Sequence, residues 1–278
     1  MGRFDLRTRN GLISPIIQGL QVVDFLLDLY PSATVAYSLR LLRSTYSGKS
    51  IRVRRSSDNT EQDIGFNNIG SLDTSDLLTF CNGSNGFVTR FYDQSGQGNN
   101  GVQTTAINQP IIVSAGALIT RNGKPYIQSS STQWLSLTTD ISTPTGSSYS
   151  IWMTYEKDTS GNQAIILKNG DNYHWLEYGT FPAIANADNV TISSAYNINT
   201  LYLHNTITNY SVSGTIYRNG VSIGSRGALT SAAISRDLPS ASFRSAKITM
   251  AEFIFYPFTQ TTNKTKIDEI INNYYAIY

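Results

Sequence analysis

The chain has 278 residues, a formal net charge of +2 and only 14% charged residues, against 11% aromatic residues. This length fits one large β domain or two ordinary domains, because β sandwiches often exceed roughly 200 residues. The balanced charge, without a long run of one sign, excludes general nucleic-acid binding. No stretch approaches the roughly 18 continuous apolar residues of a membrane span. We therefore expect neither nucleic acid nor membrane as a partner.

Cysteine occurs once, at Cys81, and histidine twice, at His174 and His204. A single cysteine forms no intrachain disulfide, so the fold must be held by its core. Zinc cages and Cys/His nucleophile pairs need more ligands or a recognisable spacing. We expect no metal site and no cofactor, with calcium as a minor alternative at one turn described below.

The first 32 residues differ in composition from the rest. Apolar residues recur there at helical spacing and Pro31 ends the pattern, which predicts a short amphipathic helix containing Leu20, Val23, Leu26 and Leu27. Residues 1–32 are thus predicted to form an arm with a helix, and residues 33–278 a separate domain.

The arm has two possible roles. Its helix could cap the domain, or the arm and helix could dock onto a partner protein, because the preceding residues lack the alternation needed to pack by themselves. The docking candidates are Arg3, Phe4, Leu6, Arg7 and Arg9.

Most of the remaining chain has the pattern of short strands. Residues 33–48 look like a second helix that stops at Gly48, and the segment after it alternates Ile51 and Val53 with arginines, which is typical of a half-buried strand. Asn-Gly pairs at 122–123, 169–170 and 219–220 predict tight turns. Further strands are predicted at 87–92, 110–114, 149–155, 163–168, 200–208, 213–218 and 246–256.

The fold class predicted from this pattern is mainly β, a sandwich or jelly roll. Near the end of the chain an amphipathic helix is expected to lie on the sandwich, because apolar residues fall at positions i, i+3, i+4 and i+7. These residues are Ile267, Ile270, Ile271 and Tyr274.

Carboxylates and aromatics could make a sugar site on such a domain. A retaining glycosidase needs two carboxyl groups about 5–5.5 Å apart, a separation that sequence spacing does not give. A single acid within a strand more often faces solvent or pairs with a lysine. The candidates on strands or at their ends are Glu156, Glu177, Asp188, Asp237 and Glu252.

The segment NYHWLEYG concentrates groups that stack on sugar rings and bind hydroxyls. The alternative is a strand whose aromatics alternate into the core. The glycan-binding candidates in it are Tyr173, His174, Trp175, Glu177 and Tyr178.

The segment RFYDQSGQGNN predicts a structural turn. Asp93, Gly96, Gly98 and Asn99 can form a turn in which the carboxylate accepts backbone N–H groups. Calcium is the alternative, disfavoured because the spacing lacks the acid positions of an EF-hand loop. The arginines of residues 52–55 are best explained by ion pairs with the acids of residues 58–63.

Two segments carry a family resemblance. The stretches AYSLRLLRSTYSGKSIRVRRSSDNTEQDIGF and LLTFCNGSNGFVTRFYDQSGQGNNGVQTTAINQP, within about residues 36–112, resemble the N-terminal part of the catalytic domain of the α-L-arabinofuranosidases of glycoside hydrolase family 54. The resemblance implies a concanavalin-like jelly-roll β-sandwich, in agreement with the strand pattern.

The chain also departs from that family. The family's turn closes with a second cysteine in a short disulfide, whereas Gly86 stands here and leaves Cys81 unpaired. Where the family has its nucleophilic Glu, this chain has FPAIANADNV, which has no Glu. Where the family has its general acid, this chain has SASFRSAKITMAEF, and Asp237 is the nearest acid upstream. The resemblance thus implies a retained scaffold without the catalytic pair, although a relocated pair among Glu177, Asp237 and Glu252 stays open.

The same signature is similar to a group of phage-encoded virion proteins, in which a short arm precedes a concanavalin-like or laminin-G-like domain. It implies a non-catalytic phage surface protein: a head fibre, a decoration protein or a tail-associated receptor-binding protein. Such a protein would be assembled in the host cytoplasm, reside on the virion surface as a homo-oligomer, contact other virion proteins through its arm and bind host or environmental glycans. The alternatives are an arabinofuranosidase-like glycosidase and a free lectin-like module.

Overall fold

The computed structural model describes most of the sandwich and both terminal helices. The described residues are 17–18, 21–22, 25–130, 133, 135–137, 141–142, 148–157, 165–169, 172–175, 197–209, 212–226, 237–238 and 248–278. Within them the chain is mainly β, with a short helix near the beginning and a longer one at the end, as predicted.

One large antiparallel sheet dominates the described part, in the order β13-β7-β6-β8-β12-β22-β15-β18-β19-β20, with β3 beside β22, β4 and β5 beside β6, and β9 beside β8. Its strands are β3 (Val35–Ser38), β4 (Ile51–Arg55), β5 (Glu61–Ile64), β6 (Gly86–Phe91), β7 (Gly101–Val102), β8 (Ile111–Ser114), β9 (Ala117–Leu118), β12 (Ile127–Ser129), β13 (Ser136–Leu137), β15 (Tyr149–Lys157), β18 (Thr200–Asn209), β19 (Ser213–Arg218), β20 (Val221–Arg226) and β22 (Ile248–Tyr256).

Smaller elements surround this sheet. Four two-stranded pairs join β1 (Ile17–Gln18) with β2 (Gln21–Val22), β10 (Thr120–Arg121) with β11 (Lys124–Pro125), β14 (Ile141–Ser142) with β21 (Asp237–Leu238), and β16 (Ile165–Asn169) with β17 (Asn172–Trp175). The helices are α1 (Leu26–Leu29), α2 (Thr74–Cys81), α3 (Lys264–Tyr275) and one 3₁₀ turn, Ala106–Asn108.

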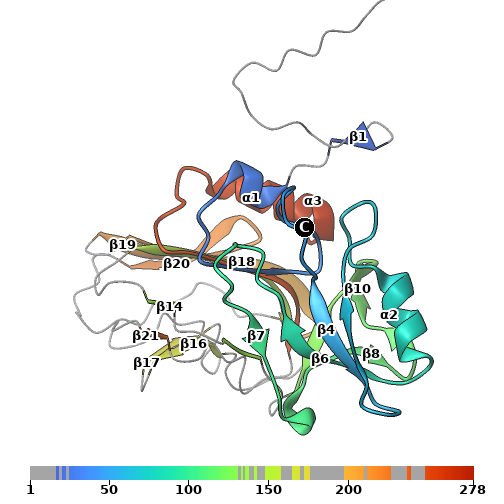
Figure 1. The fold of residues 1–278 in the computed structure, drawn as a ribbon. Helices are drawn as coiled ribbons and strands as arrows, with labels where there is room; N and C mark the ends of the chain where they lie inside the picture. The colour runs from blue at the N-terminus through green and yellow to red at the C-terminus, as the bar shows by residue number, and fades with distance from the viewer. Residues whose placement is uncertain are drawn as a thin grey trace, which may run out of the picture.

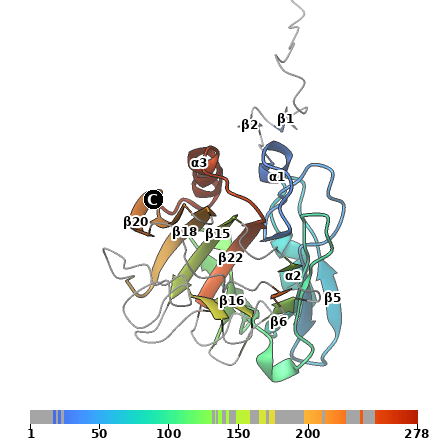
Figure 2. The same ribbon diagram turned by 90° about the vertical axis from the view of Figure 1, so that its left-hand side faces the viewer.

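The sheet bends into two layers with the core between them. Figure 1 shows β18, β19 and β20 running beneath α1 and α3, while β4, β6 and β8 form the other wall. Figure 2, turned by 90°, separates the layer of β15, β18 and β22 from the layer of β5 and β6. The layers pack Tyr37, Phe91 and Phe253 between them, with ring centroids 5.2 Å apart for Tyr37–Phe91 and 6.2 Å for Tyr37–Phe253.

Two of the helices predicted from the sequence differ in the structure. Residues 35–38 form β3, because this apolar run is buried on both faces between neighbouring segments and pairs with β22; a short apolar run does not distinguish a buried strand from a helix. Of the predicted N-terminal helix, the described residues show only Leu26–Leu29 as helical, preceded by the β1–β2 pair, while Leu20 and Val23 lie outside the described residues. Leu26 and Leu27 are both fully buried. The helical spacing of apolar residues in this segment thus corresponds to a single helical turn, in which these two leucines are buried in the core.

The predicted strands and tight turns are confirmed where the structure describes them. In β4, Ile51 and Val53 are buried and the arginines between them are partly exposed. Asn219 and Gly220, between β19 and β20, both have positive φ, 51° and 79°, as the two central residues of a type I′ turn require. Asn122 and Gly123 form the same kind of turn between β10 and β11.

Helix α3 lies on the outer face of the β15–β18 layer. Ile267 and Ile271 are fully buried, as their spacing predicts. Asp268 fixes the helix to the sheet, because one of its oxygens accepts the Trp152 indole N–H at 2.7 Å and the Asn205 amide at 2.8 Å. Lys264 binds the other oxygen at 2.7 Å. Burial raises the pKa of Asp268 above its ordinary value even though these three donors act in the opposite direction.

Cys81, at the end of α2, is a buried free thiol that faces Gly86. A Cβ placed on Gly86 would lie 2.7 Å from Cys81 Sγ and 3.2 Å from both Val53 Cγ1 and Val113 Cβ. The absence of a side chain at position 86 therefore makes room for the thiol. The two positions are adjacent, as the family resemblance implied.

Gly86→Ala is expected to lower the free energy of unfolding by about 1–3 kcal/mol, because the added methyl group overpacks this contact. Cys81→Ala in the same chain should recover part of the loss, since it removes the nearest atom. Urea unfolding of the parent, both single variants and the double variant measures this coupling. An alanine variant at 86 as stable as the parent would contradict the packing.

Candidate functional site

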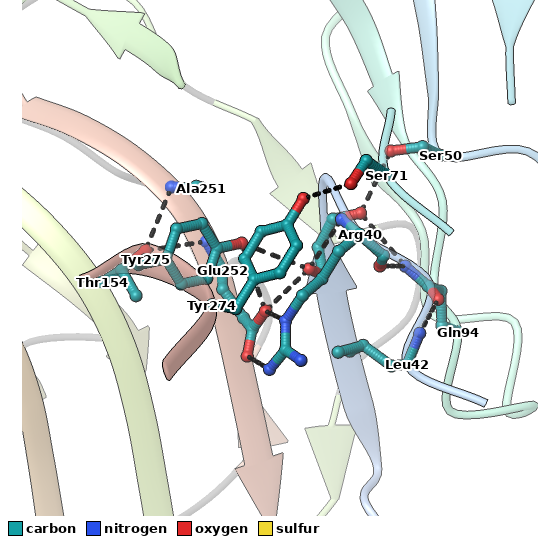
Figure 3. Close-up of polar contacts among 11 residues, drawn as sticks. Arg40, Leu42, Ser50, Ser71, Gln94, Thr154, Ala251, Glu252, Tyr274 and Tyr275 are labelled. Carbon is teal, nitrogen blue, oxygen red and sulfur yellow. Dashed lines mark hydrogen bonds and ion pairs between the residues drawn. The ribbon is translucent and has the colours of Figure 1, made fainter. Parts of the chain in front are cut away.

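A buried ion pair lies at the junction of β3, β22 and α3 (Figure 3). Arg40, two residues beyond β3, donates from Nε to Glu252 Oε2 at 2.8 Å and from Nη2 to Glu252 Oε1 at 2.9 Å. The side chains are only 7% and 1% exposed. Strand pairing places Ser38 directly opposite Glu252, so the bidentate geometry follows from the register of β3 on β22.

The surroundings complete the hydrogen bonding of Glu252. The Ser38 hydroxyl donates to Oε2 at 2.8 Å and the Tyr275 hydroxyl to the same atom at 3.2 Å. The Arg40 guanidinium lies over the Tyr274 ring, 5.1 Å from its centroid. This cation–π contact further stabilises the charged arginine. Burial alone would lower the pKa of Arg40, but the charge and hydrogen bonds of Glu252 raise it above its ordinary value. Both oxygens of Glu252 are therefore bound by donors of the fold, and neither is open to a substrate.

Gln94 links this ion pair to the turn predicted from the sequence. Its Nε2 donates to the backbone oxygens of Ser38 at 3.0 Å and Arg40 at 2.9 Å, and its Oε1 accepts from Leu42 N at 2.8 Å (Figure 3). Sequence reasoning did not single out this glutamine. The sequence shows it only as one amide within the turn motif. Its importance becomes visible in the structure, where the side chain is fully buried.

The turn at Asp93 has the predicted geometry. Oδ1 of Asp93 accepts from Ala36 N and Ser95 N, at 2.8 and 2.9 Å, and Oδ2 accepts from the Ser95 hydroxyl and Asn99 N, at 2.6 and 3.0 Å. Gly96 and Gly98 have positive φ values of 91° and 76°, a conformation that favours glycine. Because four donors occupy the carboxylate, this turn is built to tie β3 to the loop after β6.

Glu156 is clamped in the same way as Glu252. The Arg121 guanidinium donates to both of its oxygens at 2.6 Å, and the Glu156 side chain is 4% exposed. The buried carboxylates of the described residues, Asp93, Glu156, Glu252 and Asp268, thus all hold strands, turns or α3 in place.

A second polar group occupies the opposite face of the same layer. Strand β18 alternates, so Tyr202, His204, Thr206 and Thr208 share one face, while Asn205 points towards α3. His204 pairs directly across from Arg218 on β19. We call Tyr155, Tyr202, His204, Thr206, Thr208 and Arg218 the inner polar row.

The inner polar row combines groups that suit sugar recognition. The Arg218 guanidinium lies 5.1 Å from the Tyr202 ring centroid, and the His204 ring lies 6.2 Å from that of Tyr155. His204 Nε2 and the Thr206 hydroxyl are 3.0 Å apart. No described residue hydrogen-bonds to the buried Thr208 hydroxyl. Aromatic, imidazole, guanidinium and hydroxyl groups are the kinds that stack on a sugar ring and bind its hydroxyls. Tyr155, Tyr202, His204, Thr206 and Thr208 are buried in this structure and Arg218 is half-buried, so a sugar would approach the row from the side of Arg218.

Only the backbone of the glycan-binding candidates in β17 is described. Tyr173, His174 and Trp175 lie in this strand, paired with β16, and the β16–β17 pair is on the side of the β15–β18–β22 layer away from α3 (Figures 1 and 2). That is the side of the inner polar row. Asp237 lies in β21. The candidates Glu177 and Tyr178, and the docking candidates Arg3, Phe4, Leu6, Arg7 and Arg9, lie outside the described residues.

Sequence reasoning missed the inner polar row. Its signal was the alternation in TLYLHNTITN, where every second residue from Tyr202 carries a polar group. Two of the three arginines of β4 pair as predicted, Arg52 with Glu61 at 2.7 Å and Arg55 with Asp58 at 2.6 Å. Arg54 instead donates to the neutral side chains of Gln109 and Asn59.

Two kinds of site are absent from the described residues. No group of three or more His, Cys, Asp or Glu side chains there could hold a metal ion. No helix in that part of the chain is long and apolar enough to cross a membrane.

Glu252→Gln and Arg40→Met are each expected to cost about 3–5 kcal/mol of stability, because each leaves a buried charge or donor without its partner. The double variant should lose less than the sum of the two, since the remaining partner is then removed as well. Chemical denaturation of the four proteins gives the coupling energy. Strict additivity would show that the pair does not act as a unit.

Comparison with known proteins agrees with this architecture. Residues 28–164 match the family model for the catalytic domain of alpha-L-arabinofuranosidase B. No curated protein sequence matches the chain.

Solved structures of arabinofuranosidases have the same fold. The structure of an arabinofuranosidase complexed with arabinofuranosyl-alpha-1,2-xylobiose superposes with a TM-score of 0.65 at 18% identity, over 88% of this chain and 63% of that one. A GH54 α-L-arabinofuranosidase soaked with a cyclic sulfate inhibitor gives 0.62 at 17% identity over the same shares. This chain thus spans less than two thirds of the length of these proteins. The fold is that of the GH54 α-L-arabinofuranosidases, and residues 28–164 carry the sequence pattern of their catalytic domain.

Proposed function

We propose that this protein binds glycans through the inner polar row and does not hydrolyse them. The observation that carries the proposal is the state of the buried carboxylates: each one in the described residues is occupied by cations or N–H and O–H donors. A retaining glycosidase instead needs two carboxyl groups about 5–5.5 Å apart around the sugar, one of them free to donate a proton. The inner polar row supplies the aromatic and hydroxyl groups that would hold a sugar.

We further propose that the protein works on the surface of a phage virion, as a head fibre, decoration or tail-associated protein. The support is the signature within about residues 36–112, which resembles such proteins, together with the arm-like composition of residues 1–32 and the single, unpaired Cys81. Homo-oligomerisation would multiply weak sugar contacts into useful avidity. Assembly in the host cytoplasm is part of the same proposal.

The second candidate is an α-L-arabinofuranosidase. It is favoured by the family match over residues 28–164 and by the shared fold. Glu177 and Asp237 would be the residues to supply the acid and the nucleophile, because Glu252 is bound to Arg40.

Incubation with 4-nitrophenyl α-L-arabinofuranoside is expected to release no 4-nitrophenol above the buffer rate, followed by absorbance. Glu177→Gln and Asp237→Asn should give the same trace as the parent, because neither residue has a catalytic role in the proposal. Release by the parent that either substitution abolishes would establish the glycosidase instead.

Deletion of residues 2–16 tests the arm. The cut stops well before Leu26 and Leu27, which are core residues, so the shortened protein should unfold at the same temperature as the parent. It should no longer co-purify with particles when expressed during infection, because its contact with other virion proteins is lost. Normal incorporation into particles would exclude the docking role.

A further inference from the structure

The layer formed by β4, β5, β6 and β8 carries a row of charged side chains on its outer face. Strand pairing places Arg52 opposite Asp63 on β5 and opposite Arg90 on β6, and Arg90 opposite Val102 on β7. The alternate residues of these strands, such as Val53 and Val88, are fully buried in the core. We call Arg52, Arg54, Glu61, Asp63 and Arg90 the outer charged face; it belongs to a different wall from the inner polar row.

Four of these five charged residues have partners. Arg52 binds Glu61 at 2.7 Å and approaches Asp63 at 3.6 Å. Arg54 donates to Gln109 Oε1 and to Asn59 Oδ1, both at 2.7 Å. The Tyr92 hydroxyl donates to Asp63 at 2.7 Å.

Arg90 is the exception. Its Nε is buried, and within the described part of the chain it has no hydrogen-bond partner and no carboxylate forms an ion pair with the side chain. Its guanidinium is held over the Tyr92 ring, 5.5 Å from the centroid. The Tyr92 ring therefore fixes the orientation of the Arg90 side chain, but no described carboxylate neutralises its charge.

This arrangement is unfavourable in the isolated protein. Arg52 and Arg90 lie directly opposite each other on two strands, and like charges in such positions are unfavourable, although Glu61 and Asp63 offset part of the charge of Arg52. A buried donor without an acceptor also loses its hydration without a compensating bond. An anion bound at the Nη atoms of Arg90 would offset the repulsion, because a guanidinium presents its donors in a planar fork that fits a carboxylate or a sulfate. The buried Nε stays out of its reach.

We propose that the outer charged face is a second binding surface, on which Arg90, assisted by Arg52, holds the carboxylate or sulfate groups of an acidic glycan. The proposal does not depend on the inner polar row. A protein partner is disfavoured, because the rings of Phe87 and Tyr92 are each covered by a guanidinium and offer no apolar anchor. A nucleic acid is disfavoured because Glu61 and Asp63 already bind Arg52, so this face offers no run of free cations for a continuous phosphate backbone.

The test is binding of the full chain to polygalacturonate, dextran sulfate and uncharged dextran at low and physiological salt, by biolayer interferometry. Arg90→Gln is compared with Arg55→Gln, which removes the same charge from the same wall. Arg55 is the matched control because Asp58 already binds it through two contacts of 2.9 and 2.6 Å. Arg90→Lys keeps the charge but removes the fork.

The parent is expected to bind at least one acidic polymer and not dextran. Tighter binding to polygalacturonate would indicate a carboxylate ligand, and tighter binding to dextran sulfate would indicate a sulfate ligand. Arg90→Gln should weaken that binding about tenfold, the loss of one bidentate charged contact, with Arg90→Lys intermediate and Arg55→Gln within about twofold of the parent. Without polymer, Arg90→Gln should unfold at the same temperature or higher, because it removes the unpaired donor.

Three results would overturn the proposal. They are a parent that binds neither acidic polymer, an Arg90→Gln variant that loses no more than Arg55→Gln, and an Arg90→Gln variant that is markedly less stable without polymer. The last would mean that Arg90 serves the fold alone.

Discussion

The bidentate bond between Arg40 and Glu252 is the constraint on which the rest of the molecule depends. It joins the end of β3 to β22, and Tyr275 adds α3 to the same carboxylate. Through Gln94 and Asp93, the turn after β6 is tied to β3 as well. Charges this deeply buried are tolerated only when fully paired and hydrogen-bonded. One junction thus fixes the first strand, the last strand, the last helix and the most distinctive turn.

That constraint bears directly on function. A carboxylate in a central strand of an arabinofuranosidase-like fold looks like a candidate for catalysis, yet in Glu252 both oxygens are bound by Arg40 and one also by Ser38 and Tyr275. Both oxygens of Glu156 and of Asp268 are likewise bound by donors of the fold. Other buried polar groups of this layer gather on the inner polar row, where the hydroxyl, imidazole and aromatic groups are those that we propose hold a sugar. The fold positions this row by simple strand alternation.

Local signals in the sequence predicted local structure well. The Asn-Gly turns, the amphipathic α3 and the Asp93 turn depend on residues close together in the chain, so their patterns could be interpreted directly. The segment 35–38 was predicted as a helix because its burial on both faces arises from β22, more than two hundred residues later. Arg40 and Glu252 are 212 residues apart, and no spacing rule connects them. The inner polar row was missed for the same reason, since Arg218 meets His204 only once β18 and β19 pair.

The most direct test of the account is a saturation-transfer NMR measurement on arabino-oligosaccharides mixed with the protein, with the anomeric signals followed in the same tube for a day. The account predicts saturation transfer to furanose ring protons, lost in Arg218→Ala, and anomeric signals that do not change. Free arabinose anomers appearing at a rate proportional to protein concentration would show that the sandwich cleaves its ligand, and would contradict the central claim.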